Sequence, residues 1–97
     1  MTMPGPMTSE NAEILALEAL GWLAGEEDGI QRFLDQSGID AGALREGAGT
    51  PEMNGAVLDF LLGHEDLLMR FCEAALVEPK DVHAARRVFG REELREI

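Results

Sequence analysis

Residues 20–33 read LGWLAGEEDGIQRF, and residues 58–71, which begin 38 positions later, read LDFLLGHEDLLMRF. When residues 20–45 are compared with residues 58–83 without gaps, seven of the 26 positions are identical. Average composition would give roughly one or two identities. This recurrence predicts one helical unit that is used twice, each copy burying its apolar face against the other. The alternative is that two amphipathic helices with similar caps resemble each other for local physical reasons.

Start and stop signals surround both copies. Thr8 or Ser9 can cap a first helix, Gly25 can end it, and Gly38 suits the left-handed end of a second helix. In the second copy Leu76 takes the position of Gly38, so its middle helix must end without that glycine. We predict helices at about residues 9–24, 27–37, 40–46, 51–62 and 79–89, and another that begins at Glu65.

The predicted fold is an all-α domain of five or six short helices, built as two related helix–helix–short-helix units. The units span about residues 12–47 and 50–89 within a single domain over residues 9–90. Residues 1–8 are expected to form a disordered tail, and residues 91–97 a frayed end after a helix that stops at Gly90. The first helix is apolar nearly all round, which is typical of a helix at the centre of a core or at a subunit interface. We expect the first and fourth helices to form the centre of the bundle.

The chain of 97 residues carries a net charge of −11, which on average repels nucleic acids and anionic membrane surfaces. Five of the eight basic residues lie in the last 18 positions. No apolar run approaches the roughly 20 residues that span a bilayer. The start of the chain has neither the basic residues nor the apolar stretch of a signal peptide, so a bacterial cytoplasm is the expected location.

No catalytic, cofactor or metal site stands out, and we expect no enzyme activity. Cys72 is the only cysteine, which excludes an internal disulfide, and it falls on an apolar stripe that is typical of a core position. His64 lies at a helix start before two acids, where a solvated side chain is expected. Two histidines and one cysteine do not favour a zinc site.

Arg32 and Arg70 occupy matching positions in the two copies. Each follows an acid by four residues, Asp28 and Asp66 respectively, which predicts an ion pair within each helix. The alternative is that the two arginines share one surface and grip an anion or a carboxylate of a partner.

The predicted helix at residues 79–89 is more basic than its counterpart in the first copy. Lys80, His83, Arg86 and Arg87 lie along it, and the first copy has a weak resemblance to a DNA-binding helix-turn-helix. The alternative function is therefore that of a regulator-associated protein that binds nucleic acid through this helix. The negative net charge of the chain argues against it.

The segments ALEALGWLA at residues 16–24, RFL at 32–34, SGID at 37–40 and VLDFLL at 57–62 resemble a family of short acidic helical proteins. It is a domain-of-unknown-function family of alphaproteobacteria, and the resemblance covers about residues 12–88. It implies a small, cytoplasmic, all-helical domain. It brings no activity and no catalytic residue.

The favoured function is a protein-interaction or adaptor module. One possible form of this module is a homodimer through the first helix, with contacts at Leu15, Ala19, Trp22 and Leu23. The candidate interaction residues are Trp22, Arg32, Arg70, His83, Arg86 and Arg87.

Overall fold

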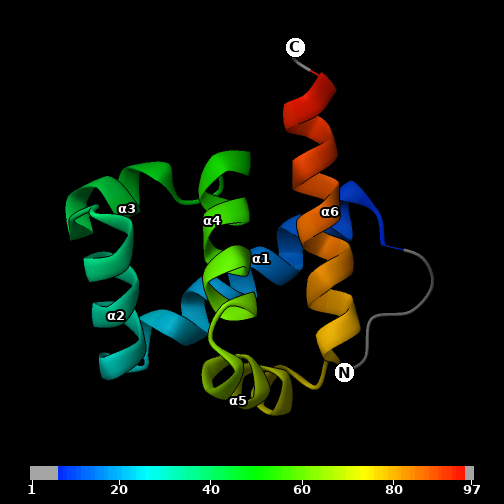
Figure 1. Cartoon of the computed structure of the whole chain (residues 1–97). Coiled ribbons are helices and arrows are strands. Elements are labelled where there is room, and N and C mark those ends of the chain that lie inside the picture. The colour runs from blue at the N-terminus through cyan, green and yellow to red at the C-terminus, as the bar shows by residue number, and fades with distance from the viewer. Residues whose placement is uncertain (1–6, 96–97) are drawn as a thin grey trace.

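The computed structural model describes the backbone of residues 7–95 and the side chains of residues 7–89. These residues form six helices and no strand, which confirms the predicted all-α fold (Figure 1). The helices are α1 (Ser9–Ala24), α2 (Glu27–Ser37), α3 (Ala41–Gly47), α4 (Pro51–Leu62), α5 (Glu65–Ala75) and α6 (Pro79–Arg95).

Side-chain caps fix the starts of three helices. The Thr8 hydroxyl accepts a hydrogen bond from the Asn11 amide at 3.1 Å, and the Thr50 hydroxyl accepts one from the Met53 amide at 3.2 Å. The Asp40 carboxylate caps α3 in the same way. Each cap satisfies an amide that has no partner within its helix, so the polar residues of the loops set the helix starts.

The two copies have the same local structure at the predicted offset. Helices α2 and α5 begin and end 38 residues apart, and α3 and α6 begin 38 residues apart. The residues that end α2 and α5 both adopt the left-handed conformation, Gly38 with φ 78° and Leu76 with φ 59°. The recurrence therefore extends from sequence to backbone. Its origin in a duplication stays a prediction.

Helices α1, α4 and α6 pack on one another at the centre of the molecule, and Figure 1 shows α1 crossing behind the other two. Ala12, Ala16 and Ala19 of α1 are each at most 1% exposed. These small side chains lie on one side of the helix and allow close approach of its neighbours. The expected central role of α1 and α4 is therefore observed, with α6 as a third member.

The third helix differs between the copies. α3 has seven residues and buries Leu44, whereas α6 has 17 residues and buries Val82, Ala85, Val88 and Phe89. The prediction that α6 stops at Gly90 is wrong, because the helix continues to Arg95. A glycine inside a helix costs only about 1 kcal/mol, and the charged residues and leucine that follow are good helix formers.

Residues 1–6 and 96–97, which include most of the predicted disordered tail and the last residues of the predicted frayed end, lie outside the described residues. Of the two described members of the tail, Met7 packs partly against the core and Thr8 caps α1. These two residues of the predicted tail therefore belong to the packed domain.

Replacing Leu76 by glycine should stabilise the protein by about 0.5–1 kcal/mol. A left-handed conformation costs an L-residue about 1–2 kcal/mol that glycine does not incur, and part of this gain is offset by the greater freedom of glycine in the unfolded chain. The Leu76 side chain is 63% exposed, so its removal sacrifices little packing. Thermal unfolding followed by circular dichroism measures the effect.

The matched control is Gly38→Leu, which introduces at the equivalent turn the strain that Leu76→Gly removes. This variant should unfold at a lower temperature than the wild type. A melting temperature for Leu76→Gly at or below that of the wild type would contradict the strain at this turn.

Candidate interaction surfaces

The described residues of the chain leave one apolar face of α1 exposed. Ile14 and Leu17 lie one turn apart and are 44% and 48% exposed. Gly21 and Ala24 continue the same face towards the end of the helix and are also exposed. The face is therefore apolar along its middle and lined by small residues at its C-terminal end.

Three of the four homodimer contacts expected on α1 lie inside the core of the chain itself. Leu15, Ala19 and Leu23 are fully buried within the chain itself. Trp22 is half-buried, and its ring packs against Phe71 of α5 with centroids 5.8 Å apart. Periodicity alone did not separate the side of α1 that other helices of the chain cover from the side left to solvent.

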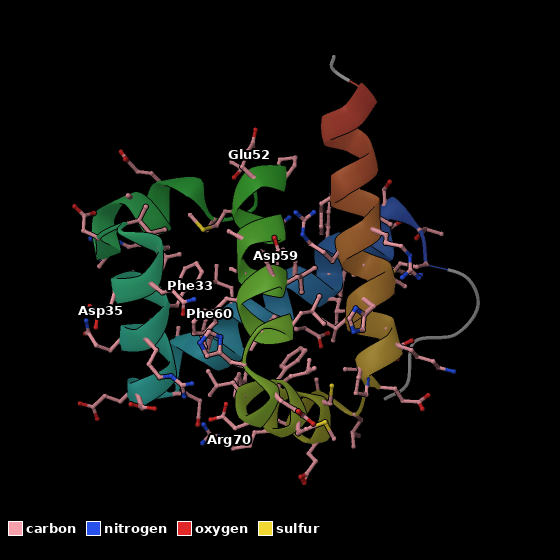
Figure 2. All side chains as sticks on the ribbon, viewed as in Figure 1. Phe33, Asp35, Glu52, Asp59, Phe60 and Arg70 are labelled. Carbon is pink, nitrogen blue, oxygen red and sulfur yellow. The ribbon has the colours of Figure 1, made fainter. Side chains whose placement is uncertain are left out.

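The two matching arginines connect the copies to each other. Arg32 of α2 donates to Asp66 of α5 at 3.2 Å, and Arg70 of α5 donates to Glu26, which precedes α2, at 3.3 Å. Figure 2 shows Arg70 at the end of the molecule where α2 and α5 meet. The two bonds run in opposite directions across this contact.

The expected ion pairs within each helix are formed in only one copy among the described contacts. Arg32 also reaches Asp28 at 3.5 Å, whereas Asp66 pairs with Arg32 instead of Arg70. The reason is tertiary, because the packing of the bundle brings the first turn of α5 next to α2. Carboxylates of this chain already pair with both arginines, and their binding of an outside anion or carboxylate stays a prediction.

The Arg32–Asp66 contact shifts the titration of both groups. The hydrogen bond from Arg32 lowers the pKa of Asp66 below its ordinary value of 3.8. The same bond raises the pKa of Arg32. Both side chains are therefore ionised throughout the physiological pH range.

The Asp66–Arg32 contact should stabilise the protein above about pH 4 and lose its effect as the pH falls through the lowered pKa of Asp66. A depressed carboxyl pKa in the folded state means that the unfolded state binds the proton first on acidification. Asp66→Asn should therefore lower the melting temperature at pH 7, and the difference from the wild type should disappear near pH 2. Thermal unfolding across this range tests the expectation.

Glu73→Gln is the control, since it removes an exposed acid of the same helix outside these ion pairs. It should leave the melting temperature at pH 7 nearly unchanged. An Asp66→Asn variant that melts with the wild type at pH 7 would show that the contact contributes nothing.

The basic residues of α6 are divided between two environments. The Arg86 Nε donates to Asp59 of α4 at 2.7 Å. Its guanidinium lies over Gly55, where an added Cβ would be 3.5 Å from the guanidinium carbon. His83 and Arg87 are exposed. The Lys80 Nζ lies 3.6 Å from the Glu78 Oε2 in an exposed ion pair. Among the basic side chains of α6 that the structure describes, Arg86 therefore ties α6 to α4, while Lys80, His83 and Arg87 form a small basic face.

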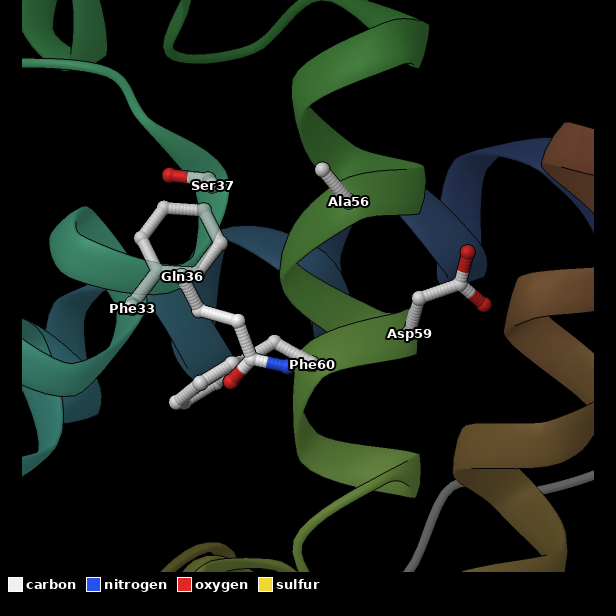
Figure 3. Close-up of a pocket in the computed structure, with 6 residues that line it drawn as sticks. All are labelled: Phe33, Gln36, Ser37, Ala56, Asp59 and Phe60. Atoms are coloured by element: carbon white, nitrogen blue, oxygen red, sulfur yellow. The ribbon is translucent and has the colours of Figure 1, made fainter.

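A groove of about 300 Å³ lies between α2 and α4 (Figure 3). The rings of Phe33 and Phe60 meet edge to face at its base, with centroids 5.3 Å apart. Gln36 and Ser37 line it from α2. Figure 3 shows the Asp59 carboxylate turned towards α6, away from the groove. The groove is at the lower end of the size range of small-molecule sites.

The residues considered for catalysis have structural contacts instead. His64 donates from Nδ1 to the Phe60 carbonyl oxygen at 2.8 Å and stacks against the Phe60 ring. Cys72 is buried, and its burial raises the pKa of the thiol, which disfavours the reactive thiolate. Within the described part of the chain, no three or more acidic, histidine or cysteine side chains are arranged to hold a metal ion.

The exposed face of α1 and the contacts of Arg32 with Asp66 and of Arg86 with Asp59 did not follow from the sequence. An acid–base pattern at helical spacing gave the wrong partner for Asp66. The pairing of Asp59 with Arg86, which lie 27 residues apart, has no local signal.

The fold and these surfaces define a small six-helix domain. The chain belongs to the family described as Protein of unknown function (DUF3572), whose model matches residues 9–92. The predicted membership of an uncharacterised family is thus confirmed, and the alphaproteobacterial origin stays a prediction. No curated protein and no solved structure matches this chain. Among the described residues, no helix has both the length and the apolar character needed to cross a membrane.

Proposed function

We propose that this chain is a protein-interaction module, without enzyme activity of its own, and that the solvent face of α1 holds its partner. The observation that carries the proposal is the exposure of Ile14 and Leu17 next to each other. Isolated apolar side chains on a surface are common, but two on adjacent turns of the helix that otherwise forms the core make a continuous apolar face.

The energy available from this face indicates a reversible contact. Covering the exposed halves of Ile14 and Leu17 would contribute about 1.5–3 kcal/mol. A micromolar complex requires about 8 kcal/mol. The remainder must come from neighbouring polar and charged contacts, so the face acts as the apolar centre of a larger interface.

Affinity capture from the native cell tests the proposal with the double variant Ile14→Gln and Leu17→Gln as bait. Glutamine keeps the helix propensity and removes the apolar surface. We expect a specific protein that the wild type retains to be reduced at least about tenfold, which corresponds to a loss of about 1.4 kcal/mol. Circular dichroism confirms that the variant is folded.

Two matched baits give the comparison. Met69→Gln with Leu76→Gln removes two other exposed apolar side chains and should keep the partner. The double variant Arg32→Gln and Arg70→Gln should melt at a lower temperature than the wild type and still retain the partner. Capture of the same proteins by all four baits would contradict a role for the α1 face.

Nucleic-acid binding through α6 is a second candidate, favoured by the exposure of His83 and Arg87 on one face with Lys80. Two features weigh against it. Arg86 is held by Asp59, and the net charge of −11 repels phosphates at longer range. The remaining basic side chains are fewer than the six to ten phosphate contacts that strong DNA binding commonly uses.

A filter-binding assay with duplex DNA at low and high salt distinguishes the candidates. Because the α6 face is small and the chain is acidic, we expect no salt-dependent retention of DNA. Retention that falls with salt and is lost in the double variant His83→Gln and Arg87→Gln would instead support the second candidate.

A further inference from the structure

The charged residues of α1 beside its apolar face are acids. Glu10, Glu13 and Glu18 are exposed on the same side of the helix as Ile14 and Leu17. α1 contains no basic residue. A partner that covers the apolar centre must also approach these three carboxylates, so the face selects its partner by charge as well as by apolar surface.

The same charges disfavour a second copy of the chain as the occupant. Packing α1 against α1 of another copy brings two sets of three glutamates into one small interface, and each copy carries a net charge of −11. Like charges across an interface cost several kcal/mol, which offsets the gain of about 3–6 kcal/mol from covering Ile14 and Leu17 in both copies. A chain of opposite charge meets no such repulsion.

The shape of the face suits a helix. The helix α1 has 16 residues, about 24 Å, and the face from Ile14 to Ala24 takes up about 15 Å of that length. At Gly21 an added Cβ would meet nothing within 4 Å, so a partner backbone or a large partner side chain can come close to α1 there. Ile14 and Leu17 form an apolar ridge next to the depression at Gly21. Side chains at i, i+3, i+4 and i+7 of a partner helix can pack against this ridge and into the depression.

We propose that the partner presents a basic amphipathic helix, whose apolar stripe covers Ile14 and Leu17 and whose Lys or Arg side chains pair with Glu10, Glu13 and Glu18. This inference rests on the proposed function and specifies its partner. Salt screens ion pairs between exposed side chains, so the complex should weaken as salt is added.

The probe is a synthetic amphipathic peptide of about four helical turns, with leucine at each i, i+3, i+4 and i+7 position and lysine elsewhere. Fluorescence anisotropy measures its binding to the full chain at low and high salt. We expect saturable binding that weakens with salt. A second peptide with glutamate in place of every lysine should not bind.

Three variants locate the site. Ile14→Gln with Leu17→Gln, and separately Glu10→Gln with Glu13→Gln and Glu18→Gln, should each weaken the lysine peptide at least about tenfold. The matched control is Glu46→Gln with Glu52→Gln and Glu73→Gln, which removes the same charge from exposed positions outside α1 and should bind almost as the wild type does.

Four results would overturn the inference. They are no binding of the lysine peptide, equal binding by the α1 and control variants, equal binding of the glutamate peptide, and a dimer in sedimentation velocity that Ile14→Gln with Leu17→Gln abolishes. Cellular capture that still depends on Ile14 and Leu17 would then leave the proposed function standing with a partner of different chemistry. If cellular capture does not depend on Ile14 and Leu17, both the proposed function and this inference are wrong.

Discussion

The close packing of α1 against α4 and α6 is the contact on which the rest of the structure depends. The alanines at positions 12, 16 and 19 of α1 allow it, because larger side chains would hold these helices apart. Helices α2 and α5 also pack against α1, so four of the other five helices contact it. With so much of its circumference covered, α1 has one face left, and that face carries Ile14 and Leu17.

The two copies of the repeated unit share local structure and differ in packing. Their middle helices have the same length and end in the same left-handed turn, and Arg32 and Arg70 bridge from each copy to the other. Their third helices have different roles, because α6 joins the core and α3 does not pack against α1 in the same way. The basic residues follow this difference. Arg86 ties α6 to α4, while His83 and Arg87 remain at the surface.

The candidate interaction residues chosen from the sequence lie in different environments for physical reasons. Arg32, Arg70 and Arg86 are occupied by carboxylates of the same chain, and Trp22 packs against Phe71. Their residue types suit interfaces, but the same chemistry serves internal contacts between helices. His83 and Arg87 are exposed. Ile14 and Leu17, which the sequence could not separate from their buried neighbours, are the residues that the proposed function requires.

The sequence by itself determined the six helices and nearly all of their ends, because caps, prolines and glycines act through hydrogen bonds and dihedral angles a few residues away. It also determined the acidic character and the isolation of Cys72. Only the tertiary structure decided which side of α1 faces solvent and that Asp66 pairs with Arg32. Those features depend on contacts between residues distant in the chain, whose energies no local pattern records.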